Sequence, residues 1–438
     1  MSQMGSGPLQ NGGRVVVIGG GPGGTAAAIT LKRKAETLGR EIQVTIVEGK
    51  HFSGEQHYNQ CAGVLSPPIT ELIERDLNIP FPYALSKGKI YGYVLHACNR
   101  DITLDGEDEP SIALRRIQFD NYMLQTAQEK GINLIPARAT GIEFHSERVV
   151  IYTESQPLEA DVVVGAFGMD EGTAMLFYRT VGYQRPQAIN SIVTKIHPGE
   201  EAMLQFGSRI HAFLPSTKQI EFGAISPKGD HLTINVAGTS VNSDFMDKFL
   251  AMPVVRQALP SCEPVNQLTF KGLHYYKGSF PSGPGKNIIG DRFVMVGDAA
   301  GLVRAFKGKG VTTAIQSGIR AAETILFEGI SGKALQTYLA SNRDILKDLP
   351  YGQIMRQLTI LASRYGLMAA VIEAAQKQDS LRQALFGAVS GHWPYQKVLK
   401  TSFSPSNIWA IGTTAISPRP RAGRITSTFD SQQKKKGI

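Results

Sequence analysis

Residues 14–49 read RVVVIGGGPGGTAAAITLKRKAETLGREIQVTIVEG, and this stretch decides the fold of the chain. It begins with four consecutive β-branched residues, 15–18, which are typical of a short strand buried on both faces. A glycine-rich turn follows, then an alanine-rich helical stretch that ends at Gly39, then a second β-branched strand that ends at Glu48. This order of strand, turn, helix, strand and acid predicts a βαβ unit that binds a dinucleotide.

The glycines of the turn each have a physical task in such a unit. Gly19 permits the tight turn, Gly21 lets the backbone approach a pyrophosphate, and Gly24 lets the helix pack on the strand. Gly23 is assigned to the same cofactor site. The carboxylate of Glu48 can accept hydrogen bonds from ribose hydroxyls, and its charge would repel a 2′-phosphate. An ordinary glycine-rich turn without a ligand is the alternative.

A distant segment favours FAD among the dinucleotides. Residues 292–310 read RFVMVGDAAGLVRAFKGKG, and a helical stretch follows. The segment resembles the second FAD signature of flavoproteins with the p-hydroxybenzoate hydroxylase fold. That resemblance implies that Asp298 binds the ribitol or pyrophosphate part of FAD, beside a loop that contains Gly308 and Gly310. It also implies that the helix starting near Val311 directs its positive end at the pyrimidine edge of the flavin.

Two weaker segments agree with this prediction. Residues 114–131, which begin LRRIQFDNY, resemble the segment of the same fold whose arginine, here Arg116, contacts FAD; a simple amphipathic helix start explains them equally well. Residues 160–172 resemble a third segment of that fold, with Phe167 in place of its usual aspartate. Since only one glycine-rich motif follows a strand, a separate nicotinamide domain is not expected. NAD(P)H is therefore a transient electron donor, or a protein or quinone takes its place, and FAD is expected to bind non-covalently.

The segment around Cys61 narrows the family. Residues 58–68, YNQCAGVLSPP, are similar to the cysteine segment of the geranylgeranyl reductase family, and residues 212–225 and 304–311 also resemble that family. The chain departs from the family pattern at residues 62–64 and at His211, Ala212 and Leu214. The resemblance implies hydride transfer from reduced flavin to a carbon–carbon double bond of a hydrophobic, isoprenoid or lipid-like substrate.

Cys61 and His211 are the candidate catalytic residues. The resemblance implies that Cys61 lies near the flavin, although a lone cysteine is often only a small buried apolar residue. His211, Tyr58 and Tyr91 are candidate proton donors, and each has a purely structural explanation as well. No metal site is expected, because the three cysteines are too far apart in sequence for usual ligand spacings.

Two other functions fit the same segments. An FAD-dependent monooxygenase of an aromatic or lipid substrate would share the fold, and a flavoprotein that modifies or assists a partner protein would share the cofactor site. A halogenase is disfavoured, because the chain has only Trp393 and Trp409 and lacks the Trp-x-Trp-x-Ile-Pro segment.

The predicted fold class is α/β: a Rossmann-type FAD-binding domain of the p-hydroxybenzoate hydroxylase kind, an inserted antiparallel β substrate domain and a helical C-terminal region. The FAD-binding domain is assigned to residues 1–60, 111–185 and 286–330, and the substrate domain to 61–110 and 186–285. In the substrate domain, AINSIVTKI, MLQFG, RIHAFLP, QIEFGAI and HLTINVAG are expected to be strands. Residues 331–420 form the helical region, and 421–438 a basic, disordered tail.

Composition adds constraints on partners and location. The formal net charge of +9 favours an anionic partner, while the scattered Lys and Arg residues argue against nucleic acid. The cysteine content fits a cytoplasmic location, with peripheral membrane contact as an option. One helical stretch carries an apolar face of Ile354, Leu358, Leu361, Leu367 and Val371. Packing of this face on the core is favoured over docking to a membrane or a partner.

Overall fold

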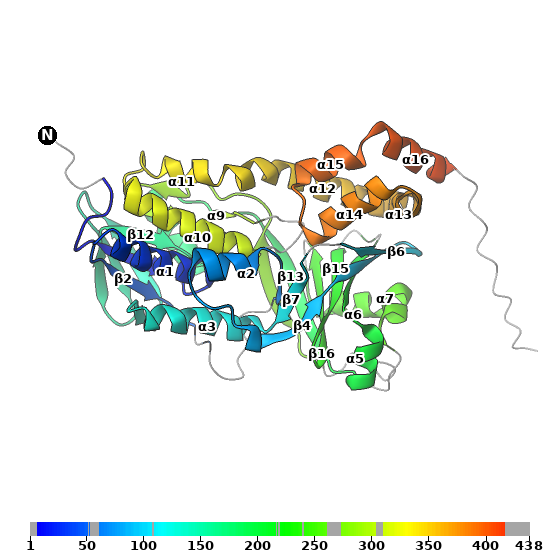
Figure 1. Ribbon diagram of the computed structural model, residues 1–438, viewed down its shortest axis with the longest axis horizontal. Coiled ribbons are helices and arrows are strands. Elements are labelled where there is room, and N and C mark those ends of the chain that lie inside the picture. The colour runs from blue at the N-terminus through cyan, green and yellow to red at the C-terminus, as the bar shows by residue number, and fades with distance from the viewer. Residues whose placement is uncertain are drawn as a thin grey trace, which may run out of the picture.

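The computed structural model describes residues 7–50, 52, 61–106, 109–215, 217, 220–238, 241–260, 273–303 and 310–416. Figure 1 shows an elongated molecule with a nucleotide-binding layer of strands and helices at one end and an antiparallel sheet at the other. The C-terminal helices lie along one side of both parts. The predicted fold class is therefore confirmed.

The first body is a six-stranded sheet in the order β18-β19-β12-β1-β2-β8. Its central strands pair in parallel, and only β18 is antiparallel to its neighbour. Helices or further strands cover both faces of this sheet, and strands covered in this way are typically short and rich in β-branched residues. Their bounds are β1 Arg14–Ile18, β2 Gln43–Val47, β8 Asn133–Ile135, β12 Val162–Gly165, β18 Ile289–Gly290 and β19 Phe293–Met295.

Helices α1 (Pro22–Thr37), α3 (Arg116–Glu129) and α10 (Gly310–Phe327) pack around this sheet (Figure 1). The backbones of α1 and α10 approach closely, because a Cβ at Gly318 would lie 2.3 Å from the carbonyl oxygen of Gly23. The short helix α9 (Gly297–Ala300) and helix α4 (Glu171–Val181) complete the body together with a three-stranded meander. The meander consists of β9 Ala139–Phe144, β10 Val149–Thr153 and β11 Pro157–Ala160.

The second body is a seven-stranded sheet in the order β17-β13-β16-β15-β14-β5-β6. All neighbours are antiparallel except β14 and β5, which run in parallel. One face packs on α6 (Ser243–Ala251) and α7 (Pro253–Ala258) through a cluster that includes Ile192, Ile225 and Phe249. The strands are β5 Gly92–Ala97, β6 Arg100–Asp105, β13 Ala188–Ile196, β14 Arg209–Leu214, β15 Ile220–Lys228, β16 His231–Gly238 and β17 Tyr276–Pro281.

Two sequence expectations differ from the structure here. MLQFG is not a strand but part of helix α5 (Glu200–Phe206), in which Glu200 and Glu201 occupy the first turn, where negative charge is favourable. Second, the proposed boundary between residues 110 and 111 falls next to a small sheet that spans it. In this sheet β7 (Ser111–Leu114) lies between β3 (Val64–Leu65) and β4 (Ser86–Ile90). Main-chain hydrogen bonds thus join segments assigned to different domains.

The helical region contains α11 Gln336–Ser341, α12 Arg343–Arg364, α13 Leu367–Lys377, α14 Asp379–Ser390, α15 Tyr395–Ser402 and α16 Pro405–Ile416. Among the described helices none is by itself long and apolar enough to cross a membrane; α12 and α13, bent by 105°, pass that test only as a pair. The apolar face predicted to pack on the core is partly open, since Ile354, Leu358, Leu361 and Leu367 are 38–49% exposed. The predicted tail, residues 421–438, lies outside the described residues.

Candidate functional site

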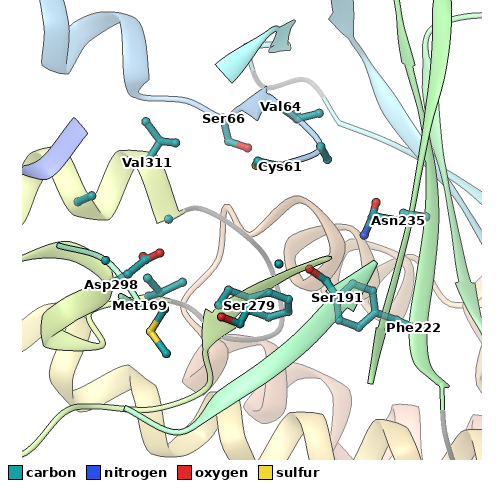
Figure 2. Close-up of a pocket in the computed structure, with 18 of the residues that line it drawn as sticks. Cys61, Val64, Ser66, Met169, Ser191, Phe222, Asn235, Ser279, Asp298 and Val311 are labelled. Carbon is teal, nitrogen blue, oxygen red and sulfur yellow. The ribbon is translucent and has the colours of Figure 1, made fainter. Parts of the chain in front are cut away.

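A cavity of about 1330 Å³ runs between the two sheets and under the C-terminal helices. Its lining begins at the β1–α1 turn, continues past Asp298 and Val311, and ends among apolar side chains of α12–α16. Figure 2 shows Asp298 and Val311 at one side, Ser191, Phe222 and Asn235 on the strands at the other, and Cys61 between them. A single small-molecule site usually occupies about 300–1,000 Å³, so this cavity has room for a cofactor and a second molecule.

The β1–α1 turn forms the inner end of the cavity. Gly19 has a φ of +115°, and a Cβ there would lie 2.3 Å from the carbonyl oxygen of Ala166. A Cβ at Gly24 would lie 2.0 Å from the carbonyl oxygen of Gly19, so the helix can start here only with glycine. Gly21 is different, because a Cβ there would meet no atom within 4 Å and would project into open space that belongs to the cavity.

Glu48 braces this turn from the end of β2. Its Oε2 accepts a hydrogen bond of 2.8 Å from the backbone N–H of Gly20, and its Oε1 accepts one of 2.8 Å from Lys50. Glu48 also lines the cavity. Each carboxylate oxygen can accept more than one hydrogen bond, so the side chain can hold the turn and still receive a ribose hydroxyl.

Asp298 and Arg116 lie further along the same wall. Burial raises the pKa of the Asp298 carboxyl, and the Arg116 guanidinium opposes that shift. Arg116 opens α3 and pairs with Asp120 at 3.0 Å, with side chains only 11% and 2% exposed. Although burial alone would lower the pKa of Arg116, the Asp120 carboxylate and the Cys61 sulfur raise it above its usual value. The Arg116 guanidinium, which is held in place by Asp120, and the Asp298 carboxyl therefore line the same stretch of the cavity.

These residues fit FAD. The open space at Gly21 lies at the N-terminus of α1, where free N–H groups favour a pyrophosphate. The start of α10, at Gly310 and Val311, lies across the cavity and also lines it. The predicted cofactor residues Gly19, Gly21, Gly23, Glu48, Arg116, Asp298, Gly310 and Val311 all line this one cavity. Gly24 packs behind the turn, and Gly308 lies outside the described residues.

Cys61 lies at the junction between the cofactor end and the apolar end of the cavity (Figure 2). Its Sγ accepts a hydrogen bond of 3.4 Å from the backbone N–H of Gly63, and its side chain is exposed to the cavity. Behind this loop lies Lys228, which is 3% exposed. Burial lowers the pKa of Lys228 to about 8, while the sulfur of Cys61 opposes the shift. Cys61 is thus surrounded by the cations Arg116 and Lys228.

Lys228 is the residue that sequence reasoning missed. It stands in a Pro-Lys-Gly-Asp turn, where a lysine is ordinarily solvated, and its burial depends on the loop that contains Gly63. A Cβ at Gly63 would lie 2.6 Å from the Lys228 Nζ, so the glycine makes room for the ammonium group. Gly63, two residues after Cys61, is the hint of such an approach that the sequence offers.

The seven-stranded sheet provides the outer wall. From β14 the cavity receives Ile210, Ala212 and Leu214, and from β15 it receives Phe222. The sheet also contributes polar lining residues, among them Ser191, Lys277 and Asn235, and the buried Oδ1 of Asn235 has no hydrogen-bond partner within the described part of the chain. A mainly apolar wall with one amide oxygen that can accept a hydrogen bond suits a large hydrophobic molecule that lies beside the ring system of a flavin.

His211 is not among the residues that line the cavity. Its Nδ1 lies 3.0 Å from the Nε2 of His96, and its ring packs at a tilt of 38° against the ring of Phe206 on α5. Burial, together with the charges of His96 and Arg209, lowers the pKa of His211 to about 4. It is therefore a neutral imidazole at pH 7 in a structural pair. The catalytic role predicted for His211 has no support in this geometry.

Tyr91, a predicted proton donor, lies apart from the cavity, and so does a cluster of two histidines and an aspartate that the sequence did not predict. Tyr91 is 56% exposed and is not among the cavity's lining residues, and Tyr58 lies outside the described residues. His197, which follows β13, and Asp230 and His231 at the β15–β16 turn hold their ligand atoms within 4.8 Å of one another. Burial, helped by the charges of Lys228 and Lys195, lowers the pKa of His231 to about 4, and these charges would equally repel a metal cation.

Comparison with known proteins finds relatives that include reductases of geranylgeranyl groups. The chain is 27% identical over 336 residues to a digeranylgeranylglycerophospholipid reductase of Methanothrix thermoacetophila, covering 71% of this chain and 77% of the relative. It is 24% identical over 339 residues to a chloroplastic geranylgeranyl diphosphate reductase of Nicotiana tabacum, covering 74% and 68%. No family model matches the chain.

Solved structures show the same fold. A geranylgeranyl bacteriochlorophyll reductase-like protein from Thermoplasma acidophilum superposes with a TM-score of 0.66 at 17% identity, over 93% of this chain and 99% of the other. A p-nitrophenol 4-monooxygenase from Pseudomonas putida gives 0.65 at 14% identity, over 89% and 99%. The predicted resemblance, the FAD cofactor and the assignment as an oxidoreductase are confirmed by these relatives and neighbours.

Proposed function

We propose that this homologue of the geranylgeranyl reductases uses FAD to saturate carbon–carbon double bonds in the isoprenoid chains of a lipid. The observation that carries the proposal is the continuity of the cavity, which joins a dinucleotide site to a long apolar arm. The named relatives act on geranylgeranyl groups, and such chains need an apolar channel of this kind.

The residues divide the work along the cavity. The turn at Gly21 and the N-terminus of α1 hold the pyrophosphate, while Glu48 receives a ribose hydroxyl. FAD, once reduced, supplies the hydride for the double bond. Ile210, Ala212 and the helices α12–α16 hold the isoprenoid chain and keep water from it. NAD(P)H enters this cleft transiently as the electron donor.

Cys61 is the proposed proton donor. It is the titratable group at the junction where both ends of the cavity meet, and Arg116 and Lys228 place positive charge beside the sulfur. Positive charge stabilises the thiolate that remains after the proton has left. The two described cysteines, Cys61 and Cys98, are free, which fits the proposed cytoplasmic, reducing location.

The experiment is an anaerobic turnover assay with mass spectrometry. The purified holoprotein is reduced with dithionite and given a geranylgeranylated glycerophospholipid, and the product is expected to gain two hydrogens for each double bond reduced. Cys61→Ser should retain bound flavin and lose most of this activity. If the product forms only in air and gains one oxygen atom, the chain is a monooxygenase. A reduced protein that leaves every isoprenoid lipid unchanged would overturn the proposal.

A further inference from the structure

The outer end of the cavity opens through exposed apolar side chains. Five large apolar side chains line the cavity and are exposed by more than a third: Leu358 (38%), Leu361 (45%), Tyr365 (71%), Leu367 (49%) and Phe403 (54%). They come from α12, from the bend before α13 and from the end of α15. A large molecule in the cavity therefore has an apolar path to the outside.

Helix α16 extends this apolar surface. It contains no charged residue between Pro405 and Ile416, and it exposes Ile408 (51%), Trp409 (71%) and Ile416 (85%). Figure 1 shows α16 projecting beyond the rest of the molecule, away from both sheets. We call these three residues together with the five at the opening the mouth surface. Monomeric proteins seldom expose so many large apolar side chains together without a partner.

The charges around the mouth surface identify the partner. Residues 354–416 contain six Lys or Arg residues and only two Asp or Glu residues. Arg364 and Lys400 are exposed on α12 and α15; Leu358 and Leu361 lie on α12, while Tyr365 and Phe403 directly follow these two helices. The segment that follows α16, residues 417–438, adds six Lys or Arg residues and one Asp. Exposed Trp, Ile and Leu among cations are the composition that binds an anionic lipid surface.

We propose that the mouth surface docks on a membrane that contains anionic lipid, so that the cavity opens directly into the bilayer. This inference goes beyond the reaction, because it concerns where the protein sits and does not depend on what it reduces. Trp409 and its neighbours enter the headgroup region, while Arg364 and Lys400 contact the lipid phosphates. A second copy of the chain is the competing occupant, but two copies of a cationic face repel each other.

The test is vesicle flotation of the full-length holoprotein with phosphatidylcholine vesicles that contain or lack phosphatidylglycerol. Strong binding is expected only with phosphatidylglycerol. The double variant Ile408→Asp/Trp409→Asp should bind about tenfold more weakly or worse. Arg364→Ala and Lys400→Ala should each weaken binding about fivefold. Leu204→Asp is the matched control, because Leu204 on α5 is 77% exposed and far from the mouth surface, and its binding should equal that of the wild type.

A spectroscopic readout locates the contact. The chain has two tryptophans, so Trp393→Phe leaves Trp409 as the only indole, and its emission should shift to shorter wavelength on anionic vesicles. The proposal is overturned if the wild type does not float, if Leu204→Asp loses as much binding as the double variant, or if the Trp409 emission does not shift. It is also overturned if the double variant instead abolishes a dimer that forms without vesicles. None of these readouts needs turnover, so they can fail or succeed independently of the reductase assay.

Discussion

At the scale of single residues, the β1–α1 turn shows two different reasons for a glycine: one is the packing of the protein itself, and the other is room for a ligand. Gly24 is required by the protein itself, because its missing side chain would overlap the backbone of Gly19. Gly21 has open space around it and a φ of −71°, which alanine also adopts, so the protein alone does not require glycine there. The requirement at Gly21 has to come from a ligand.

Gly21→Ala and Gly24→Ala should therefore behave differently. The free energy of unfolding of the cofactor-free Gly21→Ala variant should stay within about 1 kcal/mol of the wild type, while its FAD affinity falls about tenfold or more. Gly24→Ala should lose about 1–3 kcal/mol of stability before any ligand is added. Chemical denaturation and flavin fluorescence titration measure the two effects. An unchanged FAD affinity in Gly21→Ala would contradict the assigned pyrophosphate position.

Lys228 gives a pH dependence whose sign can be worked out. Its pKa falls from the usual 10.5 to about 8 on folding, mainly because of burial. Above pH 8 the folded chain has released this proton while the unfolded chain still holds it. The contribution of Lys228 to stability therefore rises from pH 8 to pH 10.5 and is lowest below pH 8.

Replacing Lys228 by Met should stabilise the protein at pH 7, by an amount on the order of 3 kcal/mol if the full shift is relieved. The advantage over the wild type should shrink as the pH rises from 8 towards 10.5. Denaturant unfolding of both proteins at several pH values measures it. A constant difference across that range would show that Lys228 keeps its ordinary pKa.

Individual residues also show which parts of the site the sequence can predict. The glycines of the β1–α1 turn and Glu48 could be predicted because their spacing along one βαβ unit fixes their geometry locally, whereas Arg116, Asp298 and Val311 were predicted from the resemblance to known flavoproteins. The cavity-facing side of β14 was not found, because a shift of one residue exchanges the faces of a strand. Ile210 and Ala212 line the cavity while His211 pairs with His96, and only the sheet register decides this. Lys228 was missed because its burial comes from a loop that lies more than 160 residues earlier in the chain.

At the scale of elements, one ion pair fastens the C-terminal helices to the antiparallel sheet. The Nε of Arg356 on α12 donates to the Oε2 of Glu221 on β15 at 2.6 Å. The side chains are 23% and 8% exposed, so removing one partner leaves a buried charge uncompensated. This ion pair joins α12 to β15, the strand that carries Phe222, and so it holds the C-terminal helices beside the cavity.

Arg356→Met should cost about 3 kcal/mol of unfolding free energy and increase backbone hydrogen exchange in α12. Arg382→Met is the matched control, because its pair with Asp379 is exposed by 57% and 63% and should contribute less than about 1 kcal/mol. Denaturation and exchange mass spectrometry of the two variants make the comparison. Equal effects in both would mean that the Arg356–Glu221 pair does not hold the helices on the sheet.

At the scale of the whole molecule, three bodies share one cavity. The six-stranded body supplies the cofactor end, the seven-stranded sheet supplies one wall, and the C-terminal helices supply the apolar arm. The fold class could be predicted, because each body has its own local pattern of strands or helices. The small sheet of β3, β4 and β7 could not, because its two-residue strand β3 has no pattern to detect.

Ala212→Trp should separate the two ends of this cavity. The added indole fills the arm beside β14, so kcat/KM for a long isoprenoid lipid should fall roughly 10–100-fold. Flavin binding should not change, because the cofactor end is formed by other strands. A series of substrates of decreasing chain length provides the control, since short chains should be spared. Equal losses for all lengths would indicate that the variant disturbs the reacting centre instead.

The tight contact between α1 and α10 bears on how the chain is made. Helix α1 ends at residue 37, but its partner starts at residue 310. At a synthesis rate of about 10 residues per second, the nascent helix waits roughly half a minute for that partner. During this time the glycines that later contact α10 are exposed to solvent or to a chaperone. An N-terminal fragment therefore cannot mature alone, and folding of the nucleotide-binding body is a late event in translation.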